Sequence, residues 1–231
     1  MKKKIVYILG GNGLIGKHIV QKMDNKKNLL IILDNNVRKK EKKKNIIQEY
    51  FDISNLFKIE DKLKKLSKKY GVPDIFINAS YPRTGNWGKI SFSNISILDI
   101  KKNLNLHLCS YTWTLIIIAG IMRKSKKTGS IVILNSIYGI LGQDKNIYKG
   151  LKMNLNPIYS IIKGGLISLV RNAASEFGDC NIRINSVISG GVKGHIASRK
   201  KRQPKKFIQR YSNKTFLKRM ADPNEIADTV C

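Results

Sequence analysis

Short apolar runs recur along the chain and alternate with segments in which apolar residues return every three or four positions. Six runs have the length of buried β-strands, at residues 5–9, 29–33, 46–51, 74–77, 131–134 and 182–188. The helical period predicts helices over 14–23, 56–69, 98–123 and 158–177. This alternation favours an α/β fold, in which helices cover both faces of a parallel sheet.

The bulk properties indicate one domain over residues 1–231. A chain of this length, 42% hydrophobic and without a linker-like segment, can bury one sizeable core. The longest apolar candidate for a membrane span, 115–121, is too short and lies inside a helical pattern. The run at 5–9 ends at glycines without a cleavage-site pattern, so it is not read as a signal peptide.

The three cysteines have neither paired nor metal-like spacing; they are Cys109, Cys180 and Cys231. Reduced thiols of this kind are typical of a cytosol. We therefore expect a cytoplasmic protein without a metal site.

The formal net charge is +29, from 44 Lys+Arg against 15 Asp+Glu. Such an excess raises nucleic acid or an anionic surface as a partner. The bases are spread over 39–44, 62–69, 124–127 and 199–206, however, without the interleaved aromatics of a single-strand binder. Lysine, asparagine and isoleucine are all over-used, as A/T-rich codons would produce. We expect solvated surface rather than nucleic-acid binding.

Four glycines lie where the first predicted strand meets the first helix, at Gly10, Gly11, Gly13 and Gly16. Backbone N–H groups in such a turn can cradle a pyrophosphate, although a merely tight turn is the alternative. Asp34 ends the next strand, where an acid would bind ribose hydroxyls and repel a 2′-phosphate. This predicts NAD as cofactor, with NADP possible because Arg38 and Lys39 follow closely.

Tyr159 stands four residues before Lys163 in a segment that Pro157 can open as a helix. At about 5 Å and an effective dielectric of about 20, the ammonium would favour a phenolate by roughly 3 kcal/mol and lower the phenol pKa by about two units. Such a phenol suits general acid–base catalysis. Tyr148 and Lys152 have the same spacing in a less helical context, so Tyr159 is preferred and Tyr148 stays open.

The glycine turn, Asp34, the strand-end Ser136, Tyr159 and Lys163 occur in an order that resembles the short-chain dehydrogenases/reductases over essentially the whole chain. The resemblance implies a Rossmann-type doubly wound sheet and an NAD(P)-dependent carbonyl/alcohol oxidoreductase. Tyr159 would transfer the substrate's hydroxyl proton. Lys163 would lower the pKa of Tyr159 and hold the nicotinamide ribose, and Ser136 would bind the reacting oxygen. An ordinary turn cap is the alternative for Ser136.

The resemblance also implies a cofactor site along the carboxyl edge of the sheet. Its predicted residues are Gly10, Gly11, Asn12, Gly13, Leu14, Ile15, Gly16, Asp34, Asp52, Ile53, Asn78, Ala79, Tyr159, Lys163, Gly190 and Val192. For Asp52, an ordinary helix N-cap is the competing interpretation.

Several positions depart from the family pattern. His107 stands where the family has an asparagine that holds a proton-relay water; it is a catalytic candidate, with a buried structural histidine as the alternative. Tyr81 replaces a glycine and could crowd the cofactor or wall the substrate pocket. Ser189-Gly190 replaces Pro-Gly. Gly194 replaces a polar residue, which puts one contact to the nicotinamide carboxamide of the cofactor in doubt.

Segments 79–84, 104–108 and 148–157 resemble members that act in surface-polysaccharide and flagellin-glycan sugar synthesis, so a small sugar derivative is the expected substrate. The alternatives are a 3-oxoacyl-carrier-protein reductase, whose acidic carrier would suit the basic surface, and a catalytically inactive cofactor-binding fragment.

The family continues into a last strand beyond the end of this sequence. We therefore expect a C-terminally truncated chain in which 182–188 forms an exposed sheet edge, and a homo-oligomer for a full-length form.

Overall fold

Six parallel strands form the centre of the computed structural model, which describes residues 3–37, 43–195 and 202–231. They are β1 (Lys4–Leu9), β2 (Asn28–Asp34), β3 (Ile46–Tyr50), β4 (Ile75–Asn78), β5 (Gly129–Ser136) and β6 (Ile182–Ser189). The order across the sheet is β3-β2-β1-β4-β5-β6. All six predicted strands and the doubly wound parallel sheet are confirmed. In the described sheet, β3 and β6 are the edges, which agrees with the expectation for 182–188.

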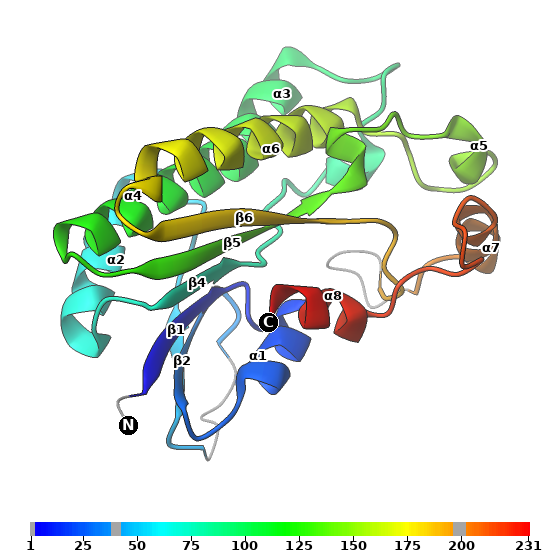
Figure 1. Ribbon diagram of the computed structural model, residues 1–231. Coiled ribbons are helices and arrows are strands. Elements are labelled where there is room, and N and C mark those ends of the chain that lie inside the picture. Colours follow the sequence, from blue (N-terminus) through cyan, green and yellow to red (C-terminus); the bar gives the residue numbers. More distant parts are fainter. Residues whose placement is uncertain (1–2, 38–42, 196–201) are drawn as a thin grey trace.

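Helices cover both faces of this sheet (Figure 1). One face carries α2 (Leu56–Tyr70), α4 (Ser110–Lys124) and α6 (Pro157–Gly178), and the other carries α1 (Gly16–Met23) and α8 (Pro223–Val230). Alternate residues of one strand serve the two cores: Tyr7 and Leu9 belong to the first, Val6 and Ile8 to the second. Because both faces are buried, the strands are almost continuously apolar.

The helix predicted over 98–123 is longer and less regular than expected. It runs through α3 (Ile97–Asn103), a π-helical turn η2 (Leu104–Cys109) and α4. By length and composition alone, Ile97–Lys124 could cross a membrane, which differs from the expectation that no segment is long enough. A core helix meets the same criterion, and α4 packs against α2 and α6.

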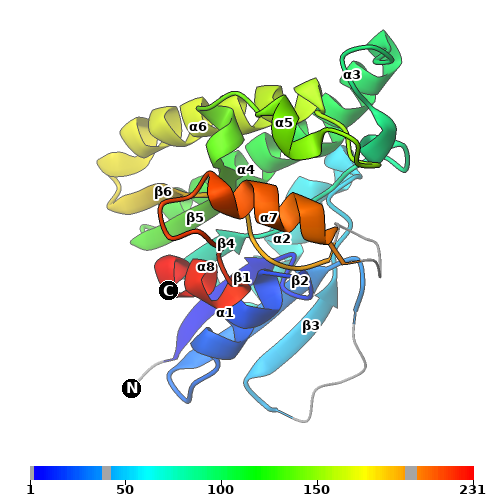
Figure 2. The same cartoon turned by 90° about the vertical axis from the view of Figure 1, so that its right-hand side faces the viewer.

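Two short helices that the apolar pattern did not predict lie beyond the carboxyl ends of the strands (Figure 2). These are α5 (Lys145–Tyr148) and α7 (Lys205–Asn213). Ile147, Phe207, Tyr211 and Met220 join them in a small separate cluster.

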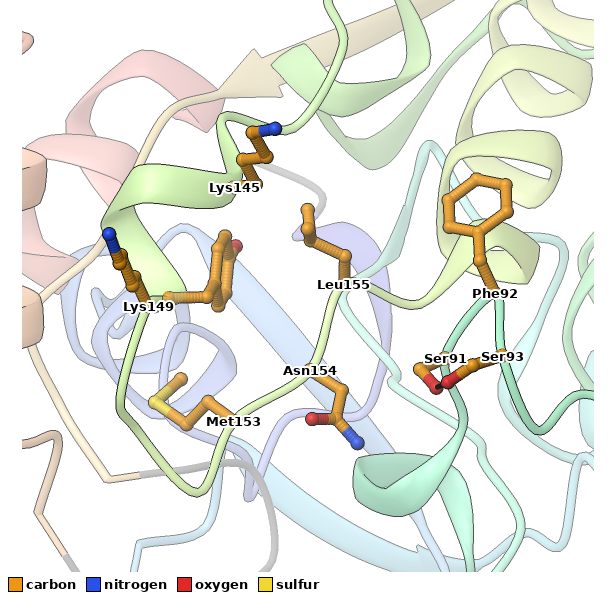
Figure 3. Close-up of a pocket in the computed structure, with 9 residues that line it drawn as sticks. Ser91, Phe92, Ser93, Lys145, Lys149, Met153, Asn154 and Leu155 are labelled. Carbon is orange, nitrogen blue, oxygen red and sulfur yellow. Dashed lines mark hydrogen bonds between the residues drawn. The ribbon is translucent and has the colours of Figure 1, made fainter.

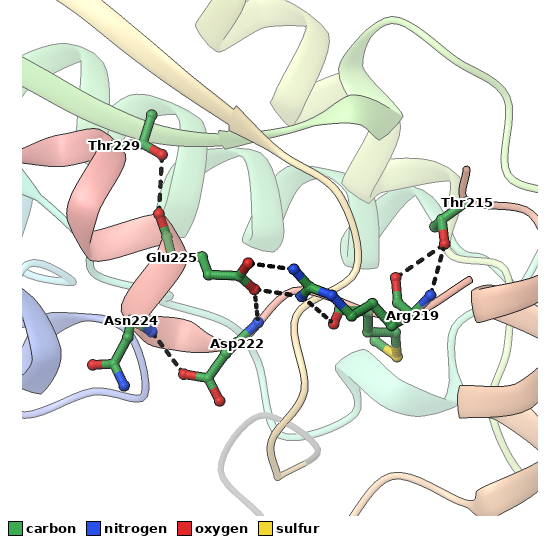
Figure 4. A network of polar contacts seen from close by, with 7 residues as sticks. Thr215, Arg219, Asp222, Asn224, Glu225 and Thr229 are labelled. Atoms are coloured by element: carbon green, nitrogen blue, oxygen red, sulfur yellow. Dashed lines mark hydrogen bonds and ion pairs between the residues drawn. The ribbon is translucent and has the colours of Figure 1, made fainter. Parts of the chain in front are cut away.

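A polar network fixes the start of α8 (Figure 4). Arg219 donates to both carboxylate oxygens of Glu225 at 2.5 and 2.6 Å, and the Asp222 N–H donates to Glu225 Oε2 at 2.7 Å. Asp222 in turn accepts from the Asn224 N–H at 2.9 Å, which completes the cap. The network fixes the start of α8, which packs on α1.

Candidate active site

The turn between β1 and α1 is so tight that Gly10 and Gly16 have no room for side chains. Gly10 has a φ of 78°, and a Cβ there would lie 2.5 Å from the Ser80 backbone. A Cβ on Gly16 would lie 2.1 Å from the Gly10 carbonyl oxygen. Gly13 is exposed at the tip, so an anionic group can approach the backbone closely. The predicted loop residues Gly11, Asn12, Leu14 and Ile15 belong to the same turn.

Asp34 lies beside this turn at the end of β2. Its Oδ2 accepts from the Asn12 N–H at 3.0 Å and its Oδ1 from the Asn36 N–H at 2.9 Å. The carboxylate is therefore held at the edge of the glycine turn, where a ribose contact is predicted. Arg38 and Lys39 lie outside the described residues.

The next strand ends also face this edge. Asn78 is fully buried: its Oδ1 accepts from the Ser80 hydroxyl at 2.7 Å, whereas its Nδ2 has no partner. An unpaired buried donor beside the glycine turn fits a cofactor hydroxyl, because such groups are otherwise bonded in folded proteins. Ala79 donates its N–H to the Leu9 carbonyl at 2.8 Å and continues the same edge.

Asp52 is not a helix cap. Its carboxylate accepts from the Ser54 N–H at 2.9 Å and the Ser54 hydroxyl at 2.6 Å, while the N-cap position of α2 is Asn55. The cap interpretation is wrong because Asp52 closes a turn that precedes the helix. Its neighbour Ile53 is buried in the core.

The structure brings Ser136, Tyr159 and Lys163 together. Ser136 ends β5, while Tyr159 lies in the first turn of α6, which Asn156 caps by accepting from the Ile158 N–H at 3.0 Å. Burial raises the pKa of Tyr159 to about 12, against a lowering hydrogen bond with Ser136. Lys163 Nζ lies 5.8 Å from the Tyr159 ring centroid.

The expectation that Lys163 lowers the pKa of Tyr159 is wrong. Burial lowers the pKa of Lys163 itself to about 7, and its Nζ donates to the Leu134 carbonyl at 3.3 Å. Desolvation disfavours the phenolate of Tyr159 and the ammonium of Lys163 alike, and it is the largest cause of both shifts. Within the protein, the hydrogen bond with Ser136 is what lowers the pKa of Tyr159.

The competing pair, Tyr148 and Lys152, does not share a helix. Tyr148 ends α5, and Lys152 lies in the following bend. The Tyr148 hydroxyl instead belongs to a phenol cluster with Tyr138 and Tyr211. This cluster adjoins the site, because the charge interactions of Tyr148 and Tyr211 also raise the pKa of Tyr159.

His107 lies in the π-helical turn and is 1% exposed. Neither ring nitrogen has a hydrogen-bond partner. Burial, with a smaller effect of the Lys163 charge, lowers its pKa well below the usual range, so the ring is neutral. A buried structural histidine would normally be hydrogen-bonded, and this one has two free positions for a water molecule.

Residues that depart from the family pattern lie beside the site. Tyr81 faces the catalytic side, with its ring edge-on to those of Tyr159 and His107. A Cβ on Gly194 would lie 2.4 Å from a terminal methyl of Leu14, so the segment after β6 passes close to the cofactor turn. In that segment Gly190 is exposed and Val192 pairs with Ala221.

Several site residues were not predicted from the sequence: Trp87, Tyr111, Tyr138 and Tyr211. They come from separate segments and share no spacing, so no pattern could have found them. A neighbouring open pocket of about 390 Å³ lies between α5 and residues 91–93 (Figure 3). Its lining includes Tyr148 but not Tyr159.

Comparisons with known proteins agree with this arrangement. Residues 12–231 match the family model described as enoyl-(acyl carrier protein) reductase. The chain is 28% identical over 239 residues to the post-translational flagellin modification protein A of Campylobacter coli, covering all of this chain and 90% of that protein. It is 26% identical over 234 residues to a 3-oxoacyl-[acyl-carrier-protein] reductase of Buchnera aphidicola, covering 97% of this chain and 87% of that protein.

A solved short-chain dehydrogenase from Leptospira borgpetersenii with bound NAD+ superposes with a TM-score of 0.85 at 25% identity, covering all of this chain and 85% of that one. The glycine turn, Asp34 and the unpaired Asn78 amide fit such a dinucleotide. The chain therefore belongs to the short-chain dehydrogenase/reductase family and is an NAD(P)-dependent oxidoreductase.

Proposed function

We propose that this oxidoreductase acts on the carbonyl or alcohol of a sugar derivative used in a cell-surface glycan. The observation that carries the proposal is the similarity to the flagellin modification protein, which extends over the whole chain. The three free cysteines are consistent with a cytoplasmic location. Assembly into a homo-oligomer is a prediction that gel filtration tests.

The cofactor supplies or takes up the hydride. A substrate oxygen placed between Ser136 and Tyr159 accepts a hydrogen bond from each hydroxyl. With a pKa of about 12, Tyr159 holds its proton at neutral pH and donates it as a carbonyl is reduced. Lys163, with a pKa of about 7, is suited to return a proton to the phenol near neutral pH. The neutral His107 would hold a water that connects Lys163 to solvent.

Replacing Tyr159 tests this mechanism directly. Tyr159→Phe keeps the ring and removes the proton donor, so turnover should fall by at least about a hundredfold while the NADH dissociation constant stays nearly unchanged. Tyr148→Phe is the matched control and should retain most activity. Both quantities follow from NADH absorbance and fluorescence. An inactive Tyr148→Phe beside an active Tyr159→Phe would show that the active site is placed wrongly.

A second candidate is a 3-oxoacyl-carrier-protein reductase, favoured by the similarity to the Buchnera aphidicola enzyme. Parallel assays with acetoacetyl-carrier protein and with nucleotide-linked and free sugars separate the two. Turnover of the carrier-linked substrate alone would replace the sugar assignment. NADH binding without any turnover would support a catalytically inactive protein.

A further inference from the structure

We propose that Tyr81, held in place by Trp87, is a specificity-determining residue that packs on the apolar face of a ring-shaped substrate such as a pyranose. The inference rests on the proposed function and names how the same site would recognise its substrate.

Tyr81 stands beside the reacting groups. It follows β4 at the carboxyl edge of the sheet, and its ring centroid lies 6.2 Å from that of Tyr159 and 5.5 Å from that of His107. The residue is 38% exposed, although Tyr159 and His107 pack against its ring. Part of Tyr81 is therefore accessible next to the catalytic phenol, although burial raises the pKa of its hydroxyl.

Trp87 fixes the orientation of this ring. Its indole Nε1 donates to the Tyr81 hydroxyl at 3.2 Å, and the two rings meet edge-on at 6.3 Å. Trp87 itself is buried, and it also packs edge-on against Tyr159 at 6.2 Å. The three rings thus hold one another, with Tyr81 as the more exposed of the Tyr81–Trp87 pair.

The segment that carries both rings is fastened on two sides. Thr84 donates to the buried Asn103 side chain from its N–H at 3.3 Å and its hydroxyl at 3.1 Å. Asn156 donates to the Trp87 carbonyl at 3.1 Å while it caps the helix that bears Tyr159. The pair of Tyr81 and Trp87, which we call the aromatic wall, is thereby tied to the start of the catalytic helix. Substrate binding therefore costs little further conformational entropy in this segment.

This arrangement favours a particular substrate chemistry. The axial C–H groups of a pyranose form a flat apolar face that packs on an aromatic ring, while its hydroxyls remain at the edge for polar partners. A flexible acyl thioester has no rigid face and gains less from such a wall. Loss of the Tyr81 ring should therefore weaken the binding of cyclic substrates more than that of acyclic ones.

The test compares Tyr81→Ala, Tyr81→Phe and the native chain with N-acetylglucosamine and UDP-N-acetylglucosamine under NAD+, and with acetoacetyl-CoA under NADH. Tyr81→Ala should raise the sugar KM about tenfold, with little change in kcat, in the acetoacetyl-CoA KM or in NADH affinity. Tyr81→Phe keeps the ring and should stay within about threefold of the native KM. Trp113→Phe, in α4 outside the catalytic site, is the tryptophan control.

A binding readout makes the test independent of turnover. Trp87 and Trp113 are the two tryptophans, so Trp113→Phe leaves Trp87 as the sole reporter. Its fluorescence in the NADH complex should respond to the two sugars, and Tyr81→Ala should abolish the response. An absent response, or a Tyr81→Ala change equal for sugars and acetoacetyl-CoA, overturns the inference. A normal response without sugar turnover instead contradicts the proposed function.

Discussion

Burial sets the charge of the ionisable residues in the site. Tyr159 and His107 are neutral at neutral pH, and Lys163 titrates near it. These states follow from desolvation, which penalises every charged form, and not from sequence spacing. In the structure described, the proton-transfer residues are thus kept mostly uncharged until ligands change their surroundings.

The depressed pKa of Lys163 makes stability depend on pH. Between about pH 7 and pH 10.5 the unfolded chain binds a proton at this lysine that the folded chain does not, so stability rises with pH in that window. Lys163→Met removes this dependence. We compare the free energies of unfolding of Lys163→Met and the native chain in urea. The variant's free energy minus that of the native chain should fall by about 2 kcal/mol from about pH 7 to about pH 9. A constant or growing difference would mean that Lys163 is charged in the fold.

Asp34 should make the cofactor preference NAD(H) over NADP(H). Its carboxylate is held by two backbone N–H groups beside the glycine turn, so it can accept from ribose hydroxyls and repels a 2′-phosphate. Fluorescence titration should give at least about tenfold tighter NADH binding, and Asp34→Ala should narrow the difference. Tighter binding of NADPH by the native chain would show the assignment to be wrong.

Local features of two helices place residues of the site. The π-helical turn of Leu104–Cys109 contains His107, within a helix that the apolar period predicts as continuous. π-helical turns of this kind are frequent at functional sites. The start of α6 likewise combines a cap, a proline and a contact to Trp87 in one residue pair, Asn156 and Pro157.

Asn156 should therefore matter to both stability and catalysis. Asn156→Ala removes the α6 cap and leaves the Trp87 carbonyl without its donor, which should lower the free energy of unfolding by about 1–2 kcal/mol and raise the KM for the substrate. Asn55→Ala is the control, because Asn55 occupies the same position of α2 without a side-chain cap bond. Urea unfolding and steady-state kinetics of both variants check this; equal effects would contradict it.

At the scale of the whole molecule, the buried cores stabilise the fold and the net charge destabilises it. Two cores bury both faces of the sheet, while a net charge of +29 makes the surface repel itself. With 44 basic and 15 acidic residues, most bases have no carboxylate to pair with. This imbalance should make stability respond strongly to ions.

We expect salt to stabilise the fold. Raising NaCl from about 0.02 M to about 0.3 M shortens the Debye length and screens the repulsion between surface lysines. The melting temperature should rise by at least about 2 °C, the shift that about 1 kcal/mol gives for a domain of this size. A melting temperature that falls over this range would show that attractive ion pairs outweigh the repulsion.

The sequence by itself determined the strands, the main helices, the glycine turn and the helical neighbours Tyr159 and Lys163, because these depend on local period and spacing. Only the tertiary structure decided the strand order, the hydrogen bond between Ser136 and Tyr159, and the contact of Trp87 with Tyr81. It also decided the pKa directions, including the failure of the expected lowering at Tyr159. The physical reason is that desolvation and packing are set by residues distant in sequence, which no local pattern encodes.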